Sequence, residues 1–231
     1  MSAKFERDGL NLTRGLLDYV RQATTLEGAG ARAIREETAK MPQAPMMIAP
    51  EQAQVMAVLA RLARPRRIVE VGVLTGYSAA WLLEALEPGG VLVACDINEE
   101  YMALAQAHWD KMGVGDRIDV RLGPGAESLQ ALLDEGWAGT VDVMFVDADK
   151  VGYDTYYTYG KELLRPGGVM FFDNVLWGGS VVDPEDQSDD TRALRAISAR
   201  ARDDDEVHAA LLTTGDGVLV VFKPFDEEDT P

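Results

Sequence analysis

Short apolar runs alternate with longer amphipathic stretches along most of this 231-residue chain. Short apolar runs between glycine, proline and polar residues are typical of buried strands, and the longer stretches have the spacing of helices that cover a sheet. Strands are predicted at 67–71, 91–95, 118–122, 141–146, 169–172, 207–212 and 218–222. Helices are predicted at about 10–25, 27–40, 50–64, 78–86, 99–112, 126–135, 153–164 and 189–202.

This order of elements predicts an α/β fold. Strands that alternate with helices form a parallel sheet with helices on both faces. The last two strands flank the turn sequence 213–217, which predicts an antiparallel C-terminal hairpin. We therefore expect a doubly wound, Rossmann-like sheet of seven mostly parallel strands. The length fits one domain over 1–231, with N-terminal helices in 1–45, and the acidic end 225–231 predicts a disordered tail.

Two of the predicted strands are followed directly by residues with carboxylate side chains. One is followed by Asp147, Asp149 and Lys150, and the next by Asp173 and Asn174. Because parallel strands end at the same edge of a sheet, we expect the three aspartates to converge. Gathered carboxylates repel one another and lose water, at a cost of roughly several kcal/mol that a divalent cation removes. With oxygen donors and no His or Cys nearby, Mg²⁺ is favoured, and Mn²⁺ or Ca²⁺ are alternatives.

The ends of the first two strands predict a cofactor. The first strand carries Glu70 and enters a turn at Gly72 with the spacing G-x-x-x-G. A dinucleotide pyrophosphate needs a second glycine where Val73 and Leu74 stand. Glu70 suits an ammonium group, and Asp96 at the end of the second strand suits the two hydroxyls of a ribose. A ribose and a cationic amine without a pyrophosphate describe S-adenosylmethionine.

Each of these signals has an alternative explanation. The glycine turn is also typical of a tight strand-to-helix connection, Asp96 could cap the following helix, and the Asp-Ala-Asp-Lys run could be a solvated loop. Their occurrence at three successive strand ends of one predicted sheet favours a functional site.

Composition limits the partners and the compartment. The formal net charge of −17 argues against binding to nucleic acid or to an anionic membrane. The single cysteine, Cys95, lies in an apolar strand, which predicts an inert buried thiol and a reducing compartment. The N-terminal residues lack the apolar segment of a signal peptide, and no apolar run is long enough to span a bilayer. We therefore expect a cytoplasmic protein.

Taken together, these residues resemble the cation-dependent class I O-methyltransferases, the caffeoyl-CoA O-methyltransferase group to which catechol O-methyltransferase is more distantly related. The resemblance covers about residues 10–224. The matching segments are 47–52 (MIAPEQ), 70–78 (EVGVLTGYS), 96–98 (DIN), 123–124 (GP), 145–150 (FVDADK), 165–168 (RPGG) and 173–177 (DNVLW).

The resemblance implies methyl transfer from S-adenosylmethionine to a hydroxyl of a small catechol-type aromatic acceptor, in a homodimer. Asp147, Asp173 and Asn174 match metal ligands. The residues that match the S-adenosylmethionine site are Ile48, Glu70, Gly72, Val73, Ser78, Asp96, Ile97, Gly125 and Asp147. Lys150 matches the catalytic base, with Asp147 beside it. Met46, Asp149 and Trp177 match residues on the acceptor side.

Alternatives remain at the level of residues and of function. Lys150 could form a surface salt bridge to Asp154, and Trp177 could simply pack against neighbouring apolar side chains. A non-catalytic metal and nucleotide sensor, or an NAD-dependent dehydrogenase, could use the same fold.

The chain departs from the family pattern in three places: Ala53, Gly178-Gly179, and the short acidic segment 182–190. Plant relatives carry a longer loop at this last position, which helps to bind coenzyme A esters. We therefore expect small free catechols to match or exceed coenzyme A esters as acceptors.

Overall fold

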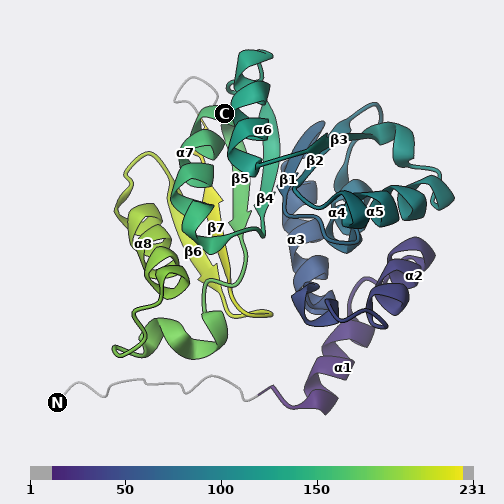
Figure 1. Cartoon of the computed structure of the whole chain (residues 1–231), viewed down its shortest axis with the longest axis horizontal. Helices are drawn as coiled ribbons and strands as arrows, with labels where there is room; N and C mark the ends of the chain where they lie inside the picture. The colour runs from purple at the N-terminus through teal and green to yellow at the C-terminus, as the bar shows by residue number, and fades with distance from the viewer. Residues whose placement is uncertain (1–11, 226–231) are drawn as a thin grey trace.

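Seven strands form one sheet in the computed structural model of this protein, which describes residues 12–225 (Figure 1). The strand order is β3-β2-β1-β4-β5-β7-β6. The strands are β1 (Arg67–Val71), β2 (Val91–Asp96), β3 (Ile118–Leu122), β4 (Val141–Val146), β5 (Leu164–Phe172), β6 (His208–Leu212) and β7 (Val218–Phe222). The α-helices are α1 (Arg14–Ala23), α2 (Ala29–Thr38), α3 (Pro50–Leu62), α4 (Tyr77–Ala85), α5 (Glu99–Lys111), α6 (Gly125–Asp134), α7 (Tyr153–Leu163) and α8 (Asp189–Asp203). Short 3₁₀ helices are η1 (Ala44–Met46), η2 (Gly115–Arg117), η3 (Lys150–Gly152) and η4 (Trp177–Val182).

The strand directions agree with the predicted fold class. Strand β1 pairs in parallel with β2 and β4, and β4 pairs in parallel with β5. Strand β7 runs antiparallel to both β5 and β6, so the hairpin closes one edge of the sheet. Every residue of β4 is buried, as expected of a central strand covered on both faces. The doubly wound, mostly parallel sheet with a C-terminal antiparallel hairpin is confirmed.

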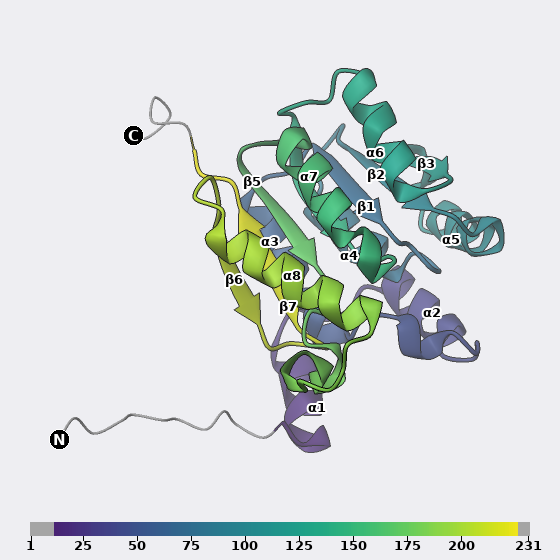
Figure 2. The same ribbon diagram turned by 60° about the vertical axis from the view of Figure 1, so that its left-hand side comes forward.

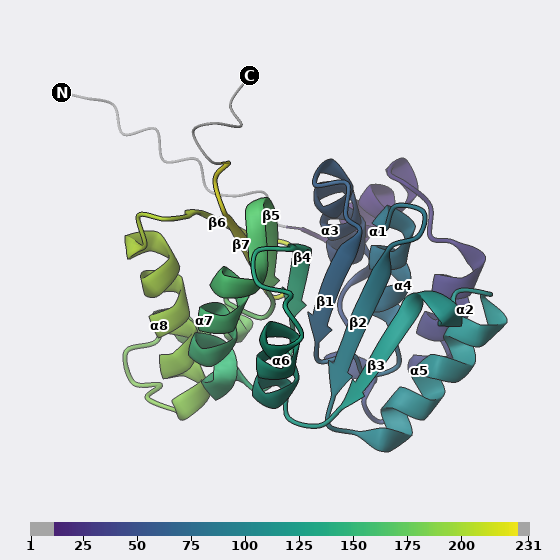
Figure 3. The ribbon, with the colours of Figure 1, turned by 90° about the horizontal axis from the view of Figure 1, so that it is seen from above.

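Helices cover both faces of the sheet. One apolar core joins the sheet to α2, α3, α4 and α5, and a second joins it to α6, α7 and α8. Figure 2 shows α6, α7 and α8 in front of the strands with α3 and α4 behind, and Figure 3 shows the same two layers from above. No helix within residues 12–225 is both long and apolar enough to cross a membrane.

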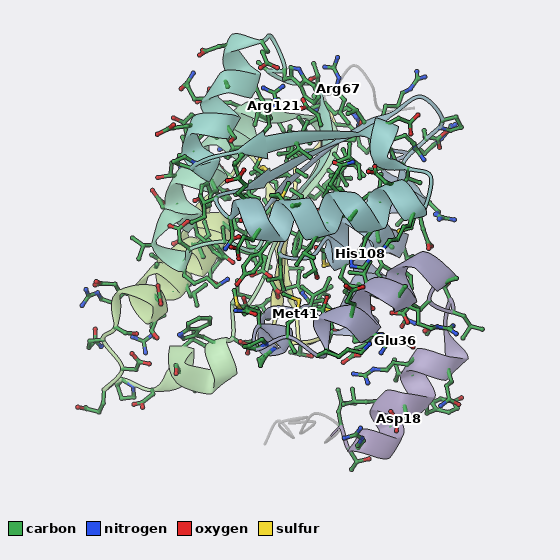
Figure 4. All side chains as sticks on the ribbon, turned by 45° about the vertical axis from the view of Figure 1, so that its right-hand side comes forward. Asp18, Glu36, Met41, Arg67, His108 and Arg121 are labelled. Carbon is green, nitrogen blue, oxygen red and sulfur yellow. The ribbon has the colours of Figure 1, made fainter. Side chains whose placement is uncertain are left out.

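Polar contacts add to the apolar packing that attaches the N-terminal segment. In α2, Thr38 Oγ1 lies 2.6 Å from Thr75 Oγ1, and Glu27 before the helix accepts a 2.7 Å hydrogen bond from the Tyr77 hydroxyl. Buried His108 on α5, labelled in Figure 4, places Nε2 3.5 Å from Glu37 Oε2 on α2. These contacts hold the N-terminal segment against the turn that follows β1.

The chain departs from the sequence prediction in strand β5. This strand begins at Leu164 rather than at 169, and includes the Pro166-Gly167-Gly168 sequence that predicts a turn. A register shift against β4 between Val141 and Val143 accommodates the proline. The short helix η4 was also not predicted from the sequence.

The predicted terminal segments are only partly described. The helix predicted at 10–25 begins at Arg14, with Thr13 as its N-cap, and residues 1–11 lie outside the described part. Of the predicted disordered tail 225–231, Phe225 packs against Phe222 at 5.7 Å between ring centroids. Residues 226–231 lie outside the described part.

Candidate active site

A cavity of about 950 Å³ opens at the carboxyl ends of the parallel strands. Segment 45–49, the 71–78 turn and the ends of β2, β4 and β5 line it. Of the residues that the sequence predicts for the site, those that line the cavity are Met46, Ile48, Gly72, Val73, Ser78, Asp96, Ile97, Gly125, Asp147, Asp149, Lys150, Asp173, Asn174 and Trp177. Glu70 is fully buried and does not line it.

The turn after β1 requires glycine at its first position. Gly72 has φ +90°, and a Cβ there would lie 2.0 Å from the carbonyl oxygen of Asp147. Glycine therefore lets the end of β1 approach the end of β4 closely. Leu74, two residues on, also has a positive φ of 52°, which is unfavourable for a residue with a side chain. The turn consequently needs an external partner to hold it.

Asp96 is that partner. Its Oδ2 accepts hydrogen bonds from the backbone N–H groups of Val73, at 2.8 Å, and Leu74, at 3.1 Å. Its Oδ1 accepts from the N–H of Asn98 at 2.9 Å. The N-cap of α5 is Asn98, whose side chain accepts from Tyr101 N, so the alternative role of Asp96 as the cap is wrong. Asp96 both lines the cavity and holds its turn.

Glu70 lies behind the cavity wall, next to the start of α4. The Ser78 hydroxyl donates to Glu70 Oε1, while Oε2 has no hydrogen-bond partner among the described residues. Burial raises the pKa of Glu70 to about 8, and the charges of Asp147 and Asp96 add to this. A buried carboxylate with an unpaired oxygen suits a cationic group. Ser78 lines the cavity and Glu70 does not, so Ser78 stands between this carboxyl group and the cavity.

Two carboxylates, rather than the expected three, meet at the edge of the cavity. Burial and the charge of Asp147 raise the pKa of Asp173 to about 7, against a 2.7 Å hydrogen bond from Asn174 N–H. Asp149 instead accepts a 2.5 Å hydrogen bond from the Tyr156 hydroxyl. Among residues 12–225, no group of three or more His, Cys, Asp and Glu side chains is placed to hold a metal ion. Asp149 therefore lines the same cavity as Asp147 and Asp173 without joining them in a metal-binding group.

The remaining donors still suit a hard cation. Asp147, Asp173 and Asn174 all line the cavity and offer two carboxylates and an amide oxygen. The charge of Asp147 disfavours ionisation of buried Asp173, and a divalent cation would relieve this repulsion.

Lys150 completes this edge of the cavity. The side chain is buried, and its Nζ donates to Asp147 Oδ1 at 3.0 Å and to the Tyr153 hydroxyl at 2.8 Å. Nζ also lies 5.8 Å from the centre of the Trp177 ring. Asp154 pairs instead with Arg200, so the alternative surface salt bridge between Lys150 and Asp154 is wrong.

Several lining or supporting residues were not predicted from the sequence. Tyr153 and Tyr156 follow Lys150 by three and six residues, a helical spacing that indicates one shared face. Gln52 reaches the Asp173 carboxylate from α3. Asp190 and Asp216 line the cavity from distant segments, and no local pattern marks them.

Comparisons with known proteins show the family to which this chain belongs. A family model described as O-methyltransferase matches residues 24–224. The mouse catechol O-methyltransferase domain-containing protein 1 is 37% identical over 208 residues, which cover 90% of this chain and 79% of that protein. Caffeoyl-CoA O-methyltransferase 1 of Eucalyptus globulus is 36% identical, with 81% and 78% covered.

Solved structures show the same relationship. The O-methyltransferase TomG from Streptomyces achromogenes, in complex with SAM, has a TM-score of 0.82 at 27% identity, with 91% of this chain and 96% of that chain covered. An O-methyltransferase from Bacillus cereus in complex with SAH has a TM-score of 0.83 at 26% identity, with 90% and 97% covered. This chain therefore belongs to the O-methyltransferase family, as an S-adenosylmethionine-dependent enzyme of the caffeoyl-CoA O-methyltransferase type.

Proposed function

We propose that this enzyme methylates one hydroxyl of a small catechol-type acceptor in a reaction that depends on a divalent cation. The observation that carries the proposal is the pair of carboxylates on Asp147 and Asp173, with Lys150 beside them, at the edge of one large cavity. This pair supports a metal, and Lys150 supports proton transfer from an acceptor hydroxyl.

The cofactor side of the cavity is built by the turn after β1. S-adenosylmethionine supplies the methyl group when it is bound. Asp96 keeps the turn in place, and the absence of a side chain at Gly72 keeps the end of β1 against β4. The carboxylate of Glu70, reached through Ser78, complements a cationic amine. These residues position the methyl donor rather than react with it.

The acceptor side is built around the carboxylate pair. Asp147, Asp173 and Asn174 would hold the cation, whose charge would lower the pKa of a nearby catechol hydroxyl. Lys150 Nζ is the group placed to receive the hydroxyl proton. Trp177 forms an apolar wall for the ring. Placing the two reactants in line in this cavity supplies much of the expected rate enhancement.

The test removes the carboxylates and the cation separately. Methyl transfer to caffeic acid is measured with Mg²⁺, with EDTA, and after Mg²⁺ is added back, together with calorimetric binding of Mn²⁺. Asp147→Asn and Asp173→Asn should each lose activity by about 100-fold or more and bind the cation more weakly.

Asp119→Asn is the matched control, because its carboxylate pairs with Arg121 on β3 and does not line the cavity. A lone phenol should not react, because it offers the cation one oxygen. Full activity in EDTA, or equal turnover of a lone phenol, would refute the proposal.

A further inference from the structure

We propose that Tyr153 is a positioning residue for Lys150, with a buried hydroxyl that fixes the lysine amine at the edge of the cavity. This inference rests on the proposed function, in which Lys150 receives the proton of the acceptor. Tyr153 is the first residue of α7 and is fully buried, without lining the cavity itself.

The hydroxyl of Tyr153 lies between two strand ends. It is 2.8 Å from Lys150 Nζ and 3.0 Å from the backbone carbonyl oxygen of Asp173, with the Val146 carbonyl oxygen farther away at 3.4 Å. A tyrosine hydroxyl has one proton, which it donates to a carbonyl here, so its oxygen accepts from Lys150. One buried hydroxyl therefore connects Lys150 to the end of β5.

Two fixed acceptors are what a lysine needs to be held in one conformation. Its long side chain has many rotamers, and fixing them costs entropy. Asp147 Oδ1 provides one acceptor at 3.0 Å, and the Tyr153 hydroxyl provides the second. With both in place, Nζ has one remaining direction, toward the cavity that Lys150 lines. Asp147 is also the proposed metal ligand, so the tyrosine hydroxyl is the acceptor dedicated to the lysine.

The ring of Tyr153 packs in the core, which is a separate role from that of its hydroxyl. A neighbouring tyrosine allows the two roles to be tested separately. Tyr153 and Tyr157 both pack against Phe172, at 5.4 and 6.1 Å between ring centroids. The hydroxyl of Tyr157 donates to Asp204 at 2.7 Å, away from the cavity. Tyr157→Phe therefore removes a hydroxyl from the same helix and the same aromatic cluster without touching Lys150.

The first experiment needs no acceptor. The purified full-length protein is reductively methylated with formaldehyde and a borane, and the labelling rate of each lysine is read by peptide mass spectrometry. Tyr153→Phe should raise the labelling rate of Lys150 about threefold or more, because the amine loses one of its two fixed partners. The Tyr157→Phe variant should label Lys150 at the wild-type rate. An unchanged Lys150 rate in a folded Tyr153→Phe protein would overturn the proposal.

The second experiment asks whether the hydroxyl acts through Lys150. With caffeic acid and Mg²⁺, Tyr153→Phe should lower kcat about 10- to 100-fold and leave the KM for S-adenosylmethionine within about twofold. In a Lys150→Met background the same change should have no further effect. An equal loss in both backgrounds would show that Tyr153 acts independently. If the wild type does not turn over caffeic acid, the proposed function fails, and the labelling rates still decide the role of Tyr153.

Discussion

Acidic side chains around the cavity differ in their surroundings, and these surroundings decide what each can do. Asp96 is paired with three backbone N–H groups and acts as a fixed anchor for a turn. Asp173 is buried beside Asp147, which makes its ionisation unfavourable without a cation. Glu70 is buried with one oxygen unpaired. The same chemical group therefore holds a turn at Asp96, suits a metal ligand at Asp173 and suits a counter-charge at Glu70.

Glu70 predicts a pH dependence of stability in the cofactor-free protein. Burial raises its pKa to about 8, whereas the unfolded chain has the ordinary value of 4.5. Between these values the folded state holds a proton that the unfolded state has lost, so stability falls as the pH rises toward about 8 and then levels off. The Glu70→Gln variant should lose this part of the dependence of the unfolding free energy on pH. At a pH of about 8.5 it should be more stable than the wild type.

Urea unfolding at several pH values measures this effect, with Glu100→Gln on the exposed face of α5 as the control. If the unfolding free energies of Glu70→Gln and the wild type depend on pH in the same way, the prediction is wrong and Glu70 ionises freely in the folded protein.

The residues at strand ends could be predicted because their position follows from topology. Once two strands are parallel neighbours, Asp147 and Asp173 must come together. The orientation of a side chain depends on its hydrogen bonds, which do not follow from topology. The bond between the Tyr156 hydroxyl and Asp149 could therefore not be predicted from the sequence. Gln52 and Asp216 reach the site only through the packing of distant elements, so their roles need the folded structure.

At the scale of elements, the proposed acceptor side adjoins the loop that follows Trp177. Arg195 on α8 donates to four carbonyl oxygens of this loop, those of Ser180, Val181, Asp183 and Asp186. A single guanidinium therefore holds η4 and the start of the acidic segment against α8. Its planar fork of donors suits this task, which a lysine could not perform.

Arg195→Ala should loosen the acceptor wall and leave the cofactor side intact. We expect the KM for caffeic acid to rise about 10-fold or more, because several hydrogen bonds that order the loop are lost together. The dissociation constant of S-adenosylhomocysteine, measured by calorimetry, should stay within about twofold. Arg192→Ala is the control, since within residues 12–225 the side chain of this arginine donates to Gln187 in the loop and to Asp189 at the start of α8. Equal effects of the two variants would show that Arg195 has no special role.

The elements themselves were largely predictable, and the exceptions have local causes. Apolar runs and turn residues marked all seven strands. The early start of β5 was missed because Pro166 and Gly167 normally interrupt a strand, and only the shifted register of β4 admits them. Helix η4 was missed because two consecutive glycines, Gly178 and Gly179, are typical of a loop. Both have a positive φ within this helix.

At the scale of the whole molecule, the homodimer remains a prediction. Helix α1 has no buried residue, and Tyr19 and Leu26 are 69% and 68% exposed. Apolar side chains of this size on the N-terminal segment suit contact with a second copy. Light scattering at micromolar concentration should give a dimer, and a Tyr19→Glu, Leu26→Glu double variant should give a monomer. Leu122→Glu, on the β3 edge strand, is the control. A monomeric wild type would contradict the prediction.

Charge across the molecule predicts which acceptors the enzyme prefers. The chain carries a net charge of −17, and Lys150 is the one basic side chain among the described residues that line the cavity. It is already paired with Asp147, while Asp190 and Asp216 line the same cavity. Arg195, close by, has its donors engaged by backbone carbonyls. No cationic group in the described part of this site is therefore available for the phosphates of coenzyme A.

Small free catechols should consequently match or exceed coenzyme A esters. We expect kcat/KM with caffeic acid methyl ester and caffeic acid to be at least equal to that with caffeoyl-CoA at the same Mg²⁺ concentration. The three share one catechol ring and differ in the charge and size of the tail. Asp190→Asn and added salt should both improve the rate with caffeoyl-CoA relative to the methyl ester, because each weakens repulsion of the phosphates. A preference of about 100-fold or more for the coenzyme A ester, unaffected by Asp190→Asn, would mean that a basic surface elsewhere, such as Arg14 and Arg21 on α1, binds the phosphates instead.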